Sequence, residues 1–158
     1  MDTAPPPPII QAACPSEARA LAPATRCGFV KVLLDRADPH GRKIRIYFEQ
    51  YRRTDRSRPR LSTIVSLEGG PGYPVTDDRA GRVKLWRPVS ERRDLVLVDL
   101  RGTGGSTPLG CNAFARTTLD YWRRAGRCAR QIGPERDFYS TSQAVQDVDV
   151  VLDALYAG

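Results

Sequence analysis

Histidine is almost absent from this chain, which has one His, one Met and three Lys among its 158 residues. The single histidine, His40, lies in the turn-like stretch DPHGR, and no two of the four cysteines form a CxxC pair. Such a composition makes a His/Cys zinc site improbable, and no cofactor is expected. No apolar run reaches the length of a membrane span, and the N-terminus lacks the basic start and apolar stretch of a secretory signal.

Lysine is scarce because arginine supplies nearly all the positive charge, with 22 Arg against three Lys and a formal net charge of +7. These arginines are scattered along the chain, without an aromatic-basic platform or a nucleic-acid motif. We interpret the skew as a compositional habit of the source genome and expect no nucleic-acid partner. A basic nucleic-acid-binding protein, whose binding would depend on salt, remains the less favoured reading.

Residues 1–26 are rich in Pro and Ala, and we expect them to form a mobile leader. Cys14 lies within this segment and Cys27 directly follows it, whereas Cys111 and Cys128 lie far along the chain. Pairing each cysteine with its sequence neighbour would close two short loops, as suits an exported protein. Four buried thiols in a cytosolic protein are the alternative.

Strand-like and helix-like segments then alternate along the chain. Four strands are expected, at residues 28–34, 43–51, 61–67 and 94–100, the first two as an antiparallel pair and the last two as a buried parallel pair. Helices are expected within 77–93, over about 113–132, and from Ser140 onward, where Ser140 and Gln143 form a capping-box pattern. The pattern predicts an α/β fold with a mostly parallel sheet and flanking helices.

Two glycine-rich loops follow the expected parallel strands. EGGPG (68–72) follows the first of them, and RGTGGSTP (101–108) follows the second. In open α/β sheets, ligands bind beyond the carboxyl ends of the strands, so these loops are expected to share one functional rim.

The ordered series GGPG, DLRGTGGSTPLGC and YSTSQAVQDVDVVLDAL resembles the N-terminal part of an α/β-hydrolase-fold serine peptidase of the proline iminopeptidase and tripeptidyl aminopeptidase group. The resemblance covers about residues 27–158. It implies an incomplete α/β-hydrolase domain that ends before the nucleophile elbow, and a secreted or cell-envelope location, with the cytoplasm as the alternative.

The resemblance assigns roles within the first loop. A backbone amide there helps to form the oxyanion hole in such enzymes, which points to Gly70, with Gly69 as its neighbour and Pro71 and Gly72 holding the turn. Glu68 departs from the family's His or Asn, and its carboxylate is expected either to face away or to hold the substrate's free amino terminus.

The second motif is assigned a bracing role. It comprises Asp99, Arg101, Gly102, Gly104 and Ser106, and an ordinary glycine-rich connection with an Arg–Asp pair is an equally good interpretation. Ser106 lacks the G-x-S-x-G context of a catalytic serine, and that pattern occurs nowhere in the 158 residues.

The resemblance therefore implies that this chain supplies the oxyanion loop of a serine hydrolase and lacks the catalytic nucleophile, acid and base. The substrates implied for a complete enzyme are short peptides with free amino termini, or amino-acid amides and esters. The alternative is a non-catalytic partner-binding module that associates with itself or with a complementing chain through an open sheet edge.

Overall fold

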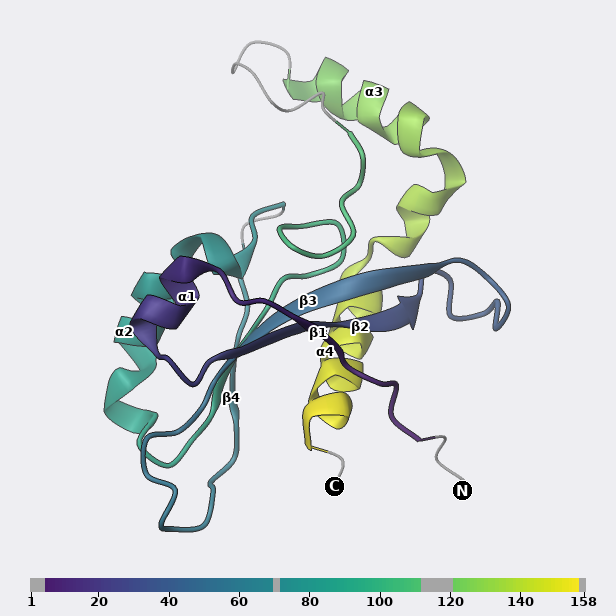
Figure 1. Ribbon diagram of the computed structural model, residues 1–158. Helices are drawn as coiled ribbons and strands as arrows, with labels where there is room; N and C mark the ends of the chain where they lie inside the picture. The colour runs from purple at the N-terminus through teal and green to yellow at the C-terminus, as the bar shows by residue number, and fades with distance from the viewer. Residues whose placement is uncertain (1–4, 70–71, 112–120, 157–158) are drawn as a thin grey trace.

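The computed structural model describes residues 5–69, 72–111 and 121–156. A five-stranded sheet organises it, in the order β1-β2-β3-β5-β4 (Figure 1). The strands are β1 (Ile10–Ala12), β2 (Arg26–Leu33), β3 (Lys43–Tyr51), β4 (Ile64–Ser66) and β5 (Leu95–Val98).

The sheet is mostly antiparallel, so the expectation of a mostly parallel sheet is wrong. The β1/β2, β2/β3 and β3/β5 pairs are antiparallel, and the β4/β5 pair is parallel. Both strand pairs expected from the sequence are present. The error lies in the antiparallel pairing of β3 with β5, which brings Phe48 opposite Val98 and which no local pattern predicts.

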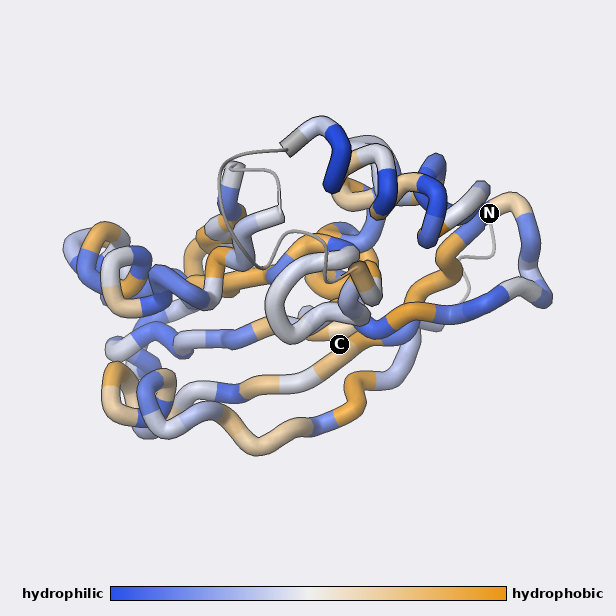
Figure 2. The backbone as a smooth tube through the Cα atoms, turned by 90° about the horizontal axis from the view of Figure 1, so that it is seen from above, coloured by the Kyte–Doolittle hydropathy of each residue, from blue (hydrophilic) through white to orange (hydrophobic). Residues whose placement is uncertain are grey.

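Both faces of the sheet are covered. The helix α4 (Thr141–Tyr156) packs Val148 and Val151 against core residues of β2, β3 and β5. On the other face, α1 (Ser16–Leu21) and α2 (Arg79–Trp86) surround a second cluster that includes Tyr51 and Leu97. Figure 1 shows α1 and α2 on one side of the strands and α4 on the other. In Figure 2, hydrophobic residues lie along the strands, and the connecting loops are mostly hydrophilic.

The helix α3 (Tyr121–Ile132) projects beyond the end of the sheet (Figure 1). It is the described part of the helix expected over 113–132, whose first residues lie outside the described ranges. Within the described ranges, 3₁₀ segments also occur at η1 (Val75–Asp78), η2 (Arg87–Val89) and η4 (Gly133–Phe138).

The segment expected to be a mobile leader carries regular structure. It contains β1 and α1, and β1 pairs with β2 with Ala12 opposite Cys27. The division of the chain into a leader and a domain stays a prediction.

The cysteines form two disulfides, Cys14–Cys27 and Cys111–Cys128, with Cα–Cα distances of 5.1 and 5.6 Å. The predicted sequence-local pairing is confirmed. Disulfides are typical of proteins in oxidising compartments, so the pairing supports an extracellular or otherwise oxidising environment. None of the described helices is both long and apolar enough to cross a membrane.

Candidate functional site

The two glycine-rich loops leave the sheet at the same end of its parallel pair. β4 and β5 run side by side with Ser66 opposite Leu97, and each loop begins within a few residues of its strand's carboxyl end. The expectation that the loops lie on one rim agrees with this arrangement.

Asp99 ties the two loops together. Its Oδ1 accepts a hydrogen bond from the Thr76 amide (3.1 Å), and its Oδ2 accepts from the Thr76 hydroxyl (2.8 Å) and from the Gly105 amide (2.9 Å). Thr76 lies in η1, just after the first loop. Burial raises the pKa of Asp99, and the bonds from Gly105 and Thr76 oppose that rise. The carboxylate therefore fixes the distance between the loops.

Ser106 is buried and links the second loop to Asp99 and to β3. Its hydroxyl donates to the Asp99 carbonyl (2.5 Å) and accepts from the Tyr47 amide (2.9 Å), which attaches the second loop to β3. Such a hydroxyl is engaged on both sides and has no access to a substrate.

Two glycines of the second loop admit no side chain. Gly104 has φ +48°, and a Cβ there would collide with the Asp99 carboxylate. A Cβ on Gly105 would lie 2.6 Å from the Tyr47 ring. Close packing, as well as turn geometry, therefore demands glycine here.

Arg101 points away from the loops into the core. Its guanidinium makes two hydrogen bonds to Asp147 (2.7 and 2.8 Å), and it also donates to the backbone carbonyls of Leu34 (3.1 Å) and Phe138 (2.6 Å). Arg36 donates to the same carboxylate at 2.5 Å. Arg101 therefore stabilises the start of the second loop by linking it to the end of β2 and to α4.

Glu68 and Gly69 are bonded to each other in the first loop. The Gly69 amide donates to Glu68 Oε1 (2.9 Å), and Arg82 of α2 pairs with Oε2. The ion pair offsets the negative charge of Glu68, which reduces the electrostatic objection to a carboxylate beside an oxyanion site. The hydrogen bond to Glu68 Oε1 occupies the Gly69 amide. Gly70 and Pro71 lie outside the described residues.

A cleft of about 810 Å³ opens beside the two loops. Its lining comes from the end of the first loop and the residue after it (Gly72 and Tyr73), and from the second loop and its continuation (Gly102 and 108–111). It also comes from α3 (Ala125, Cys128, Ala129 and Ile132) and from the segment after α3 (Arg136 and Tyr139). The Cys111–Cys128 disulfide joins two of these walls. Among the described residues, no group of three or more His, Cys, Asp or Glu could hold a metal ion.

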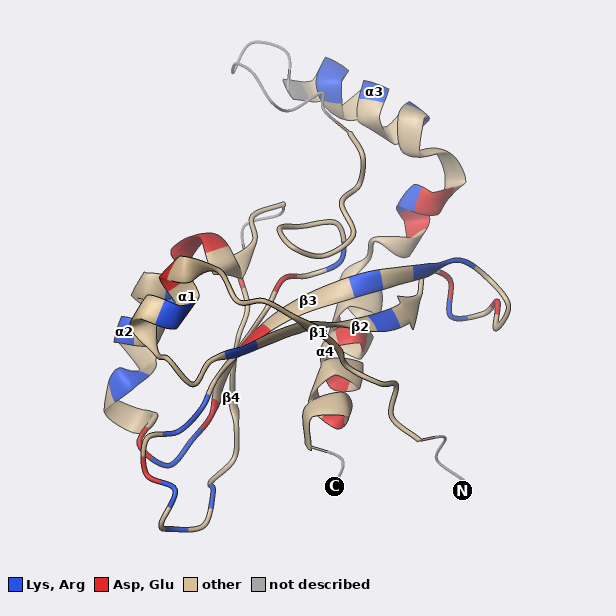
Figure 3. Ribbon diagram, in the orientation of Figure 1, with Lys and Arg blue, Asp and Glu red and all other residues tan. Residues whose placement is uncertain are grey.

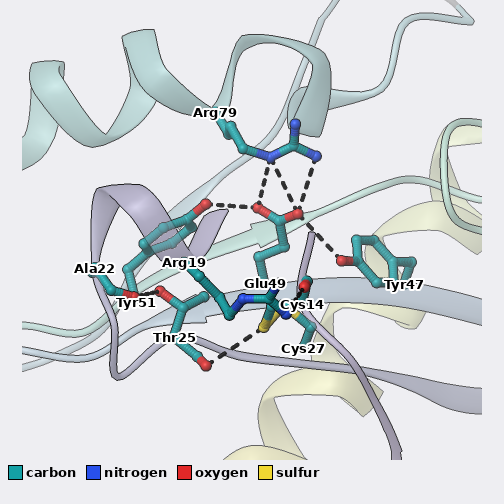
Figure 4. The surroundings of a disulfide bond; sticks show 9 residues. All are labelled: Cys14, Arg19, Ala22, Thr25, Cys27, Tyr47, Glu49, Tyr51 and Arg79. Carbon is teal, nitrogen blue, oxygen red and sulfur yellow. Dashed lines mark hydrogen bonds and ion pairs between the residues drawn. A yellow bond between two sulfur atoms is a disulfide. The ribbon is translucent and has the colours of Figure 1, made fainter. Parts of the chain in front are cut away.

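A buried carboxylate that the sequence analysis did not single out lies behind the rim. Glu49 is fully buried and accepts hydrogen bonds from the hydroxyls of Tyr51 (2.7 Å) and Tyr47 (3.2 Å), while Arg79 of α2 pairs with it at 3.1 Å (Figure 4). Burial, aided by Glu49, raises the pKa of both tyrosines. The pattern Tyr-x-Glu-x-Tyr on one strand face was the available signal, but Arg79 is 30 residues away in sequence.

We expect Asp99→Asn to loosen the junction of the loops. An asparagine side chain can accept only through its oxygen, so at least one donor loses its partner, either at the buried Thr76 or at the part-buried Gly105 amide. Stability should fall by about 1–3 kcal/mol, measured by urea unfolding. Asp77→Asn, at an exposed position of η1, is the matched control, and equal stability of the two variants would contradict the assigned role.

Comparison with known proteins gives a partial match. A tripeptidyl aminopeptidase of Streptomyces lividans is 32% identical over 93 residues, which cover 54% of this chain and 17% of that protein. The tripeptidyl aminopeptidase of Streptomyces coelicolor is also 32% identical over 93 residues, covering 54% of this chain and 16% of that protein. The match thus spans about a sixth of these relatives. No family model matches the chain. The similarity supports a relationship between this chain and the peptidases.

Proposed function

We propose that the chain is the N-terminal portion of a serine hydrolase, an aminopeptidase that releases residues or short peptides from free amino termini. The observation that carries the proposal is the meeting of the two glycine-rich loops at one cleft, beyond the carboxyl ends of β4 and β5. Such a rim is where ligands bind in open α/β sheets. The similarity to two tripeptidyl aminopeptidases supports the same function.

The chemistry proposed for the complete enzyme is acyl transfer. A serine attacks the substrate carbonyl, a histidine takes its proton, and an aspartate orients the histidine. The amide of Gly70 stabilises the oxyanion that forms, a contribution of about 3–4 kcal/mol for one such donor. The engaged amide of Gly69 makes Gly70 the better candidate. Asp99, Arg101 and Ser106 hold this rim in place and perform no chemistry.

The serine, aspartate and histidine of that mechanism are not assigned to any residue of this chain. We therefore expect the 158-residue chain alone to leave amino-acid and tripeptide anilides uncleaved. Hydrolysis of such a chromogenic anilide, released above the rate of a heat-denatured sample, would contradict the proposal that the nucleophile lies elsewhere.

The proposal itself is tested by reading the source DNA beyond codon 158 in all three forward frames. A strand-like stretch followed by G-x-S-x-G, with a later Asp and His, is the expected result. A stop codon followed by unrelated sequence would contradict it. That outcome would favour the second candidate, a partner-binding module, which is motivated by the position of β4 as an edge strand of the described sheet.

The proposed enzyme is exported and acts on short peptides or on amino-acid amides and esters. The two disulfides support its location, and the relatives' names support its substrates. The role of Glu68 in holding a substrate's amino terminus stays a prediction.

A further inference from the structure

The wall that α3 contributes to the cleft is made of small or apolar side chains. Ala125, Cys128, Ala129 and Ile132 line the cleft and recur at spacings of three and four, so they share one face of the helix. The arginines of α3, drawn blue in Figure 3, include Arg127 and Arg130, which are exposed and do not line the cleft. The helix thus presents small apolar groups inward and charge outward.

The facing walls are also largely apolar. Pro108, Leu109 and Tyr139 line the cleft beside backbone surface at Gly102 and Gly110. A volume of about 810 Å³ lies within the range of about 300–1,000 Å³ found for small-molecule pockets. The space suits an uncharged side chain with part of its peptide backbone.

One charge lies on this lining. Arg136 is the only charged residue among the described residues that form the cleft. Its Nη1 donates to the Ala129 carbonyl (3.4 Å), and its Nε lies 3.6 Å from Asp137 Oδ1, in an ion pair whose side chains are 54% and 75% exposed. An exposed pair of this kind is weak, so the guanidinium can exchange Asp137 for another carboxylate. Neighbouring Glu135 is paired with Arg42 at 2.6 Å.

We infer that the cleft binds the carboxyl-terminal residue of a short peptide, with the apolar side chain inside and the α-carboxylate on Arg136. Planar guanidinium groups bind carboxylates in two-pronged geometry, and the same positive charge disfavours a lysine or a free amino terminus in this cleft. The inference rests on the proposed function, because it takes the peptide bound beside the first glycine loop to be a substrate. Among the peptide substrates, it predicts a preference for short peptides with a free carboxyl terminus and an apolar last residue.

The test is direct binding to the ¹⁵N-labelled 158-residue chain, followed by NMR through the amide shifts of Gly72, Gly102 and Gly110. The probes are N-acetyl-leucine, N-acetyl-leucinamide and N-acetyl-lysinamide. We expect N-acetyl-leucine to bind about fivefold more tightly than N-acetyl-leucinamide, as one exposed ion pair allows, and N-acetyl-lysinamide to bind least tightly. Absence of binding by N-acetyl-leucine, or preference for the lysine probe, would overturn the inference.

Two variants, each with a matched control, separate the effect of the Arg136 charge from the effect of the cleft volume. Arg136→Gln should bring the ratio between the two leucine probes to about one, whereas Arg127→Gln, which removes the same charge from an exposed site outside the cleft, should leave the ratio at about five. Ala129→Phe should fill the cleft and abolish binding of both leucine probes, whereas Ala80→Phe, at an exposed position of α2, should not. Because Arg136→Gln alters only a half-exposed side chain, it tests the inference even where Ala129→Phe fails to fold.

These outcomes are independent of the test of the proposed function. Binding measurements need no nucleophile, so selective binding without a downstream G-x-S-x-G stretch would refute only the proposed enzymatic function. A downstream catalytic set with no selective binding would refute only the assignment of the cleft.

Discussion

Asp147→Asn should lower the free energy of unfolding by about 3–5 kcal/mol, the cost of leaving a buried charge without its partner. Asp147 and Arg101 have side chains only 0% and 2% exposed, and the carboxylate also accepts a hydrogen bond from Arg36. Removing its charge leaves the guanidinium of Arg101 uncompensated in the core. Urea unfolding followed by tryptophan fluorescence measures the change.

The matched control is Asp149→Asn, which removes the same charge from an exposed position on the same helix and should change stability by less than about 0.5 kcal/mol. A second variant, Asp147→Asn combined with Arg101→Met, removes both charges and should recover part of the loss. Equal effects of Asp147→Asn and Asp149→Asn would show that the buried pair contributes little.

Reduction of the two disulfides is the second large effect. The bridges join cysteines 13 and 17 residues apart, and a loop of about 15 residues corresponds to about 3 kcal/mol of lost chain entropy in the unfolded state. We expect each bridge to contribute about that much, so reduction of both removes a large share of the 5–15 kcal/mol typical of a domain. The measurement is the urea midpoint with and without a phosphine reductant.

Serine pairs separate the two contributions. Cys14→Ser with Cys27→Ser tests the bridge next to β1, and Cys111→Ser with Cys128→Ser tests the bridge in the cleft wall. The reductant should have no effect on a variant with all four substitutions. An unchanged midpoint after complete reduction of the native chain would contradict the entropic argument.

Local signals in the sequence predicted the elements well. β3 spans the predicted 43–51, since its aliphatic alternation, with Ile44, Ile46 and Phe48 inward, is the direct signature of a strand with one face on a core. The disulfide pairing followed from sequence proximity. The parallel β4/β5 pair followed from two short apolar runs separated by a helix.

Non-local pairing was the source of the errors. Which strand neighbours β3 depends on the position of β5 in the finished sheet, and no property of the stretch 43–51 encodes it. The short β1 lies in Pro- and Ala-rich sequence and is held by pairing with β2, against its own weak propensity. The carboxylates of Glu49 and Asp147 are buried because arginines far away in sequence meet them, which a reading of local patterns cannot foresee.

The contact between Gly105 and the Tyr47 ring makes distant positions depend on each other during sequence divergence. A larger residue at 105 would require a smaller one at 47, and loss of the tyrosine hydroxyl would remove a donor from the buried Glu49. Tyr51 and Arg79 would then be the remaining partners of the Glu49 carboxylate. Gly105, Tyr47 and Glu49 are therefore expected to change together or to stay unchanged, and a single substitution at Gly105 is not tolerated.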